Sequence, residues 1–337
     1  TLRRLHTLCP KGAARVITAV LKSFGREYLD VAIRSGDLRV HIMERPALWM
    51  QDAEIAALQD KLRHIAARTL PEGDLTYGVF APNGAGLRET VITLVTDKAG
   101  NPVAFNALAI MTVDVAPQPQ QVLHLGLVMV DPDVQQRNLS WVLYGVTCFL
   151  IFARRQLRPI WISNVTQVPA VVGMVDGMFS DVWPGPRAGP RKLSHLMLAR
   201  GIMAEHRAVF GVGSEATFDE DSFVISNAYT GGSDALGKSW EGAPKHRDAA
   251  YNAYCDAVLD YDRGDDVLQI GRMEMAAMRR YLVRAVPRSA VLSLLVTAVV
   301  VALRHVVLPV LHWADADQDW RDLRRWTGAG QLRGVGK

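Results

Sequence analysis

The residues best suited to chemistry lie between positions 121 and 140, where an apolar run passes through a polar turn. Residues 121–130 have the composition of a β-strand, and those after Leu139 have the composition of an apolar helix. The start of a helix leaves backbone N–H groups without intrahelical partners, and the helix dipole adds partial positive charge there. The turn from Gln135 to Ser140 is therefore a candidate pyrophosphate site, with a plain helix-capping turn as the alternative.

The spacing of this turn resembles motif A of the GNAT superfamily of N-acyltransferases. Those proteins carry Q/R-x-x-G-x-G/A at a strand-to-helix turn, and Gln135-x-x-Asn138-x-Ser140 is similar to it in degenerate form. Asn138 and Ser140 replace residues that let the backbone approach a phosphate closely, but Asn tolerates a left-handed backbone and Ser is small. The resemblance covers residues 39–180 and implies an acyl-transfer enzyme.

The resemblance also implies where the co-substrate, acyl-CoA or acetyl-CoA, binds. In the family, the turn amides hold the CoA pyrophosphate, and the preceding strand offers backbone groups to the pantetheine arm. The implied CoA-binding residues are Val128, Met129, Val130, Gln135, Gln136, Arg137, Asn138, Leu139 and Ser140. An acyl carrier protein in place of CoA stays open, and the reaction implies no metal.

His124 is the candidate catalytic residue. Family members with a glutamate general base carry it eleven positions before the motif, and this position is His124 here. Histidine has a near-neutral reference pKa, so it can take a proton from an amine acceptor. A half-buried structural histidine is the alternative. The family's general-acid tyrosine aligns with Val175, which leaves that role unfilled.

The elements that position these residues follow the order of the family fold. We expect strands at 39–43, 89–96, 103–113, 121–130 and 159–164, and helices at 51–68, 139–155 and 169–175. The order predicts an α/β (α+β) fold with a mixed, mostly antiparallel central sheet, GNAT-like, with flanking helices and helical N- and C-terminal extensions. Asn164, at the end of the strand at 159–164, is the candidate substrate-binding residue.

The rest of the chain divides by composition. We expect an amphipathic helix at 11–34, a loop at 180–192, a helix at 193–206, short strands at 208–212 and 223–227, a long loop at 226–248, and helices at 245–260 and 265–285. The predicted domains are a helical extension (1–38), the acyltransferase-like domain (39–228), a loop and helical extension (229–288), a hydrophobic helix (289–311) and a polar tail (312–337).

The hydrophobic segment at 289–311 has two interpretations. It is long enough to cross a membrane if Arg304 is included, and arginines precede it while aspartates follow it. This arrangement favours a cytoplasmic catalytic portion at the inner face of a membrane, and with it a lipid-like acceptor. The alternative is a helix buried in the core or in the interface of a homo-oligomer.

Composition excludes several classes. A chain of 337 residues with 49% hydrophobic and 21% charged residues is not disordered, and a net charge of +4 is too small to indicate a nucleic-acid partner. The three cysteines lack metal or disulfide spacing.

The function that the resemblance implies is acyl transfer to a small-molecule or lipid-like amine by direct attack in a ternary complex. The alternatives are a non-catalytic GNAT-fold binding protein and a membrane-anchored interaction protein.

Overall fold

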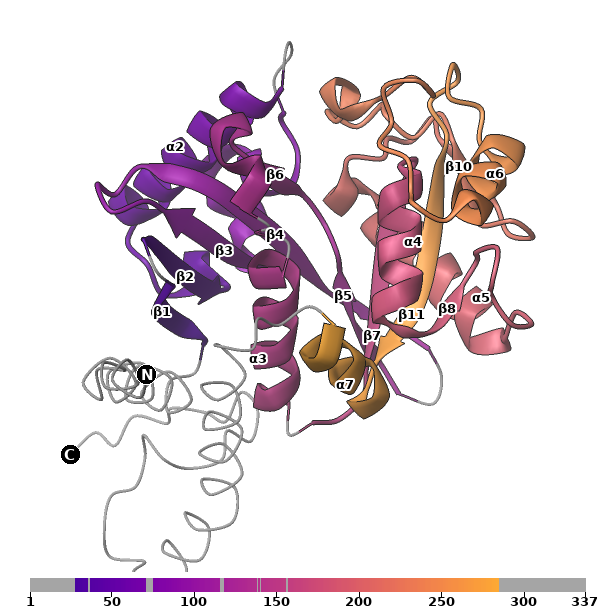
Figure 1. The fold of residues 1–337 in the computed structure, drawn as a ribbon, viewed down its shortest axis with the longest axis horizontal. Helices are drawn as coiled ribbons and strands as arrows, with labels where there is room; N and C mark the ends of the chain where they lie inside the picture. Colours follow the sequence, from indigo (N-terminus) through magenta and orange to yellow (C-terminus); the bar gives the residue numbers. More distant parts are fainter. Residues whose placement is uncertain are drawn as a thin grey trace, which may run out of the picture.

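The computed structural model describes residues 28–284, except for Gly36, 71–74, 116–117, Asn138, Ser140 and Gln156. The described chain is an α+β protein built on one open, mixed and mostly antiparallel sheet (Figure 1). This architecture confirms the predicted sheet with flanking helices. The extensions at 1–27, 289–311 and 312–337 lie outside the described residues.

The elements alternate along the chain. The strands are β1 (Asp30–Ser35), β2 (Leu38–Glu44), β3 (Thr90–Thr96), β4 (Pro102–Val113), β5 (Gln120–His124), β6 (Val128–Val130), β7 (Ile160–Thr166), β8 (Ser180–Trp183), β9 (Thr217–Asp219), β10 (Val224–Ser226) and β11 (Asp266–Met273). The helices are α2 (Asp52–Thr69), α3 (Thr147–Arg154), α4 (Pro169–Met178), α5 (Leu193–Gly201), α6 (Ala249–Val258) and α7 (Met275–Arg284). The sheet order is β1-β2-β3-β4-β5-β7-β11-β10-β9, with β6 beside β4 and β8 beside β11.

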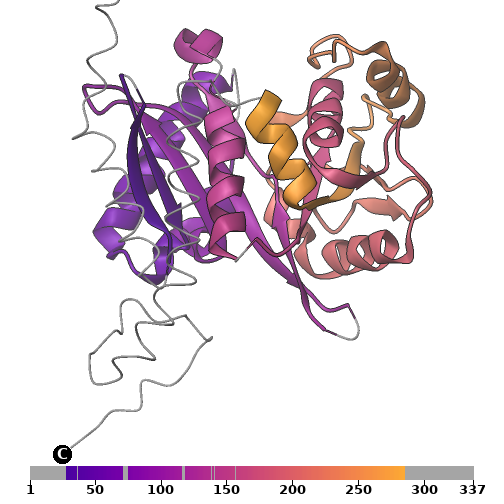
Figure 2. The same cartoon turned by 60° about the horizontal axis from the view of Figure 1, so that its bottom comes forward.

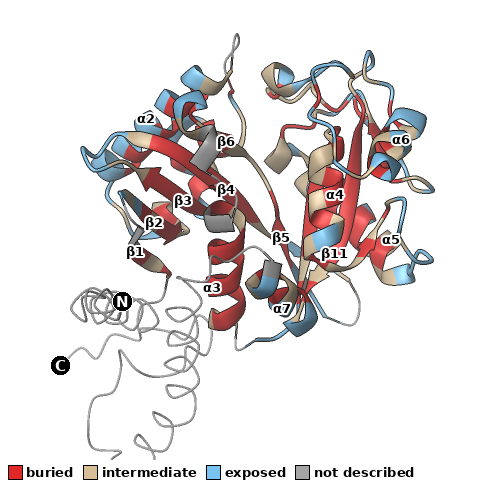
Figure 3. Cartoon of the chain, in the orientation of Figure 1, coloured by how far each residue is buried: buried red, intermediate tan, exposed pale blue. Residues whose placement is uncertain are grey.

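Helices cover both faces of the first half of the sheet. In β3, Val91 and Val95 pack into the core under α3, whereas Ile92 and Leu94 pack into the core under α2. This alternation follows from the two-residue period of a strand. The described part of α3 is buried along its length (Figure 3), and α3, α7 and α4 lie on one face of the sheet (Figure 2).

The second half of the sheet is also covered on both faces. In β11, Val267 packs with α4 and α6, and the next residue, Leu268, packs with α5 on the opposite face. Both halves meet at β5 and β7, which pair in parallel from Val122 to His124. Every other strand pairing within the described residues is antiparallel.

The predicted strand at 121–130 is interrupted at Gly126 and forms two strands. Leu125 N–H bonds to Ser163 of β7 at 2.7 Å, whereas Leu127 O accepts from Ala107 of β4 at 2.9 Å. A side chain at Gly126 is excluded, because a Cβ atom there would lie 2.5 Å from Ala107 O. Beyond this break β6 stays beside β4 and diverges from β7.

The largest correction concerns residues 265–285, for which the spacing predicts one helix. They form strand β11 and then helix α7. Because β11 is buried on both faces, its apolar run lacks the alternation that marks a half-exposed strand. Its Gly271 packs closely against β8, since a Cβ atom there would lie 2.8 Å from a methyl group of Val182.

Smaller corrections affect the ends of elements. Residues 30–34, the predicted end of a helix at 11–34, belong instead to strand β1, because pairing with β2 satisfies their backbone groups. Residues 207–210 form a 3-10 helix where 208–212 was expected to be a strand, and β8 lies within the predicted loop at 180–192. β1 and β11 add strands to the sheet from outside the segment 39–228.

Several predictions hold. The hairpin between β3 and β4 turns at Asp97, whose N–H bonds to Asn101 O at 2.9 Å, and α2 buries the predicted stripe of Ile55, Leu58, Leu62 and Ile65. The helix predicted at 139–155 begins as a π-helix (Trp141–Val146) before α3. None of the helices between residues 28 and 284, as far as the structure describes them, is long and apolar enough to cross a membrane.

Candidate functional site

A cleft of about 1140 Å³ opens where β6 and β7 diverge. Tyr144 and Val171, from the side of the sheet that carries α3 and α4, line it. His206 and Phe210, from the segment that covers the opposite face, line it as well. The cleft therefore passes through the sheet at the break between β5 and β6.

His124 is the predicted catalytic residue, and it lies in this cleft at the end of β5. Its Nδ1 is 3.0 Å from the hydroxyl oxygen of Ser163, and its ring stacks on Phe210 with the ring centres 4.9 Å apart. Only 2% of the residue is exposed. Burial disfavours the imidazolium and lowers the pKa of His124 to about 3, so the near-neutral pKa expected from the sequence is wrong. His124 is neutral at pH 7.

Val128 presents its backbone to the cleft. In the ladder between β4 and β6, Val128 lies opposite Asn106. The hydrogen bonds to β4 are made by the C=O of Leu127 and the N–H of Asp131, on either side of Val128. Antiparallel bonding alternates, so the backbone N–H and C=O of Val128 point away from β4. Among the described strands, β6 pairs only with β4, so no described strand bonds to the N–H and C=O of Val128 on the edge that faces away from β4.

Met129 and Val130 face the two cores rather than the cleft. Met129 is buried in the cluster under α2, and half-buried Val130 packs against the cluster under α3. Their side chains thus fix β6 in place. Within β6, Val128 is the residue that lines the cleft.

Two acidic residues, Asp131 and Asp133, precede the predicted phosphate turn at 135–140. The carboxylate of Asp131 accepts a hydrogen bond from Asp133 N–H at 3.0 Å, and Arg68 from α2 bonds to both carboxylates. The hydrogen bond from Arg68 is the main reason why the pKa of Asp131 is lowered. The Asp133 amide, two residues before the predicted turn, is therefore already bonded within the protein.

The rest of the predicted turn is described only in part. Gln135, Gln136 and Arg137 belong to the 3-10 helix Pro132–Arg137. Leu139 is buried in the core under α3, whereas Asn138 and Ser140 lie outside the described residues. The assignment of these residues to a CoA pyrophosphate thus stays a prediction.

Asn164, the predicted substrate-binding residue, lines the cleft. Its amide nitrogen lies 3.4 Å from the amide oxygen of Gln269 on β11, and only 2% of the residue is exposed. Of the predicted site residues, His124, Val128 and Asn164 thus line one cleft.

Sequence reasoning missed a buried acid in the same cleft, Asp266. The Tyr229 hydroxyl donates a hydrogen bond to its Oδ1 at 2.9 Å, and burial raises the pKa of Asp266 to about 7. Tyr77 and Tyr229 also line the cleft, and burial raises the pKa of both phenols. The sequence feature that could have indicated this buried acid is the pair Asp265-Asp266 directly before an apolar run.

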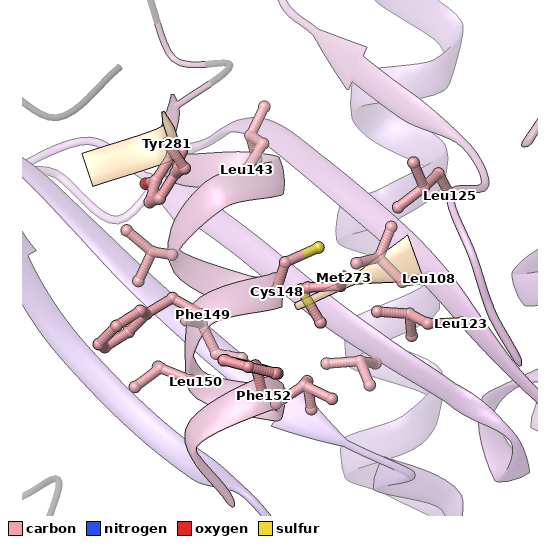
Figure 4. Close-up of a cluster of buried hydrophobic side chains, with 14 of the residues drawn as sticks. Leu108, Leu123, Leu125, Leu143, Cys148, Phe149, Leu150, Phe152, Met273 and Tyr281 are labelled. Carbon is pink, nitrogen blue, oxygen red and sulfur yellow. The ribbon is translucent and has the colours of Figure 1, made fainter. Parts of the chain in front are cut away.

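The two cysteines in the described part of the chain, Cys148 and Cys255, are not positioned for chemistry. Cys148 lies in the core under α3, among Phe149, Met273 and Tyr281 (Figure 4). Burial raises the pKa of Cys148 and of Cys255 to about 12, which keeps both thiols protonated at pH 7. Within the described residues, no group of three or more His, Cys, Asp or Glu side chains could hold a metal ion.

No family model matches the chain, and no curated protein matches it. A functional proposal rests on the geometry of the cleft and on the order of the elements around it.

Proposed function

We propose that the chain is a GNAT-type N-acyltransferase that moves an acyl group from acyl-CoA to an amine acceptor. The observation that carries the proposal is the outward-pointing backbone of Val128 in β6, beside a large cleft that also contains His124. The order of β2, α2, β3, β4, β5 with β6, α3, β7 and α4 supports it, because the family fold follows the same order.

The β6 edge suits an extended ligand that carries amide groups. The pantetheine arm of CoA contains amides, and such a chain can bond to an exposed strand edge as an added strand does. The N–H and C=O of Val128 are the groups offered on this edge. The CoA diphosphate then lies toward the turn at 135–140.

The reaction would proceed by direct attack in a ternary complex. The amine nitrogen attacks the thioester carbonyl, the new C–N bond forms, and the C–S bond breaks to release CoA. A backbone N–H at the β6 edge stabilises the developing oxyanion. The ammonium proton passes to water in the cleft, and water protonates the leaving thiolate.

His124 acts in this proposal as a neutral hydrogen-bonding group at the reacting amine. A base with a pKa near 3 does not hold a proton at pH 7, so water carries the proton away. Ser163 and Phe210 fix the plane of the ring. Asn164 is proposed to contact the acceptor, a small-molecule or lipid-like amine, from the β7 side.

A non-catalytic acyl-CoA-binding protein is the second candidate. Asp131 already accepts from the Asp133 amide just before the turn, and Val175, at the position of the family's general acid, is fully buried. A membrane-anchored interaction protein, and with it the cytoplasmic, inner-face location, depends on residues 289–311, which lie outside the described residues.

The test has two stages. Acetyl-CoA should raise the melting temperature of the full chain, because a ligand that binds only the native state stabilises it. Thiol release from acetyl-CoA in the presence of a panel of amines then separates an enzyme from a binding protein. A melting temperature unchanged by acetyl-CoA and by longer acyl-CoA donors would exclude both the acyltransferase and the acyl-CoA-binding protein.

A further inference from the structure

Asp266 occupies an unusual position for a carboxyl group. It begins β11, opposite Ile225 of β10, and only 4% of it is exposed. It nevertheless lines the cleft, so a bound ligand can reach it. A buried carboxylate is costly unless a cation or several hydrogen bonds compensate its charge.

The protein itself supplies little compensation. Within the described chain, Tyr229 is the hydrogen-bond partner of the Asp266 carboxyl, and no Lys, Arg or His forms an ion pair with it. The adjacent Asp265 provides the contrast, since Arg263 bonds to both of its oxygens at 2.8 and 2.6 Å. Asp265 is thus paired with an arginine, whereas Asp266, which lines the cleft, has no cationic partner within the described chain.

The phenol that bonds to Asp266 is held rigidly. Ala228 N–H bonds to Gly264 O at 2.8 Å, which joins the segment after β10 to the turn before β11. Gly264 has a φ of 76°, and a Cβ atom there would lie 3.2 Å from the Tyr229 ring. Glycine therefore satisfies both the backbone conformation and the packing of the ring.

The surroundings suit an organic cation. Tyr77 and Tyr229 both line the cleft beside Asp266, and aromatic rings attract ammonium groups through their negative faces. Apolar side chains such as Leu127, Val165 and Leu236 line the same cleft. An alkylammonium group matches this combination of one carboxylate, aromatic rings and apolar wall.

The strand register separates this subsite from His124. Opposite His124 on β7 is Ser163, and opposite Leu268 on β11 is Val165, so His124 and Asp266 lie on the same face of the sheet. Along the strand direction they are about four residues apart, or roughly 13 Å. A cation at Asp266 is therefore distinct from the amine that reacts beside His124.

The geometry points to Asp266 and Tyr229 as a subsite that binds a cationic ammonium group of the acceptor, remote from its reacting amine. The acceptor class is thus a molecule with two separated nitrogen functions, such as a long-chain diamine. The acceptor role rests on the proposed function, whereas the affinity of the subsite for a cation does not.

The test compares two probes of equal length, n-hexylammonium and 1-hexanol, by titration calorimetry on the full chain at pH 8. We expect the wild-type chain to bind hexylammonium at least tenfold more tightly than hexanol. Asp266→Asn should abolish that preference, because asparagine keeps the shape and can still accept from Tyr229 but carries no charge. Tyr229→Phe should reduce the preference and leave it detectable.

A second measurement needs no variant. At pH 6.5, hexylammonium should release protons from the wild-type chain on binding, detected as a heat that changes with the ionisation enthalpy of the buffer, whereas hexanol should release none. Equal affinities for the two probes, or a preference that survives in Asp266→Asn, would overturn the subsite.

Acetyl-CoA distinguishes the two proposals. Its effect on the melting temperature should be the same in Asp266→Asn as in the wild-type chain. An Asp266-dependent preference for hexylammonium without any effect of acetyl-CoA would remove the acyltransferase and keep the cation subsite. Stabilisation by acetyl-CoA without a preference for hexylammonium would remove the cation subsite and leave the proposed acyl-CoA binding intact.

Discussion

The Nδ1 atom of His124 lies 3.0 Å from Ser163 Oγ, across the short parallel pairing of β5 and β7. This contact connects the two halves of the sheet at the point where the cleft opens. The imidazole in this contact is neutral at pH 7, because burial lowers the pKa of His124 to about 3.

Replacing His124 with Ala should lower kcat at least tenfold and change acetyl-CoA affinity little, because the ring contacts the reacting amine in our proposal. Ser163→Ala, which removes only the partner of Nδ1, should have a smaller effect. Steady-state kinetics with the best amine and titration of acetyl-CoA measure the two effects. An equal loss of turnover and affinity would indicate a structural histidine instead.

Val128→Pro should weaken acetyl-CoA binding about tenfold, because it removes an N–H that points away from β4 and leaves the β4–β6 ladder bonds intact. Val128→Ala is the matched control, since it trims the side chain and keeps the N–H. Calorimetric titration of both variants decides the matter. Similar affinities in the two would show that the β6 edge does not bind the pantetheine arm.

Asp266→Asn should become more stable relative to the wild-type chain as the pH rises. Burial raises the pKa of Asp266 from 3.8 to about 7, so the native state binds more protons than the unfolded state between those values. The wild-type chain therefore loses stability over this range, by up to about 1.4 kcal/mol per pH unit, and the variant does not. Urea unfolding of both proteins at pH 4 and pH 7.5 measures the difference, which should be near zero at the lower pH.

His124 has the opposite effect on stability. Its pKa falls on folding, so the unfolded state binds the extra proton between about pH 3 and 6.5, and stability rises with pH there. In the wild-type chain, the effects of Asp266 and His124 on the free energy of unfolding therefore partly cancel between about pH 4 and 6.5. A wild-type stability that changes little with pH over this range would conceal both effects. The comparison with Asp266→Asn exposes the His124 contribution.

Gly145→Ala should destabilise the protein by a few kcal/mol, because the added Cβ would overlap the Tyr281 ring of α7. Gly177→Ala in α4 is the control, since nothing lies within 4 Å of a Cβ atom there and alanine favours a helix. Thermal unfolding should show a lower melting temperature for the first variant only. Unchanged stability in Gly145→Ala would mean that α7 does not pack as described.

Sequence predicts the elements whose pattern is local. The stripe of α2 repeats at helical spacing, and the turn between β3 and β4 carries Asp97, Gly100 and Asn101 in a hairpin arrangement. These signals depend on neighbours within a few residues. The structure confirms both the helix and the turn.

Contacts between distant segments were beyond sequence reasoning. β11 belongs to a segment that the sequence predicts as a helix, because both faces of the strand are covered and its apolar run lacks the alternation of a half-exposed strand. Tyr229 meets Asp266 only because β10 and β11 pair. The His124 ring stacks on Phe210, which belongs to a segment predicted as a strand.

The insertion of β11 beside β7 has a consequence for how the protein is made. Asn164 and Gln269 lie on adjoining strands but are 105 residues apart in the chain. During synthesis the outer edge of β7 therefore stays unpaired until the ribosome has delivered almost all of the described polypeptide. An early stop before residue 266 would leave a bare apolar strand that invites self-association.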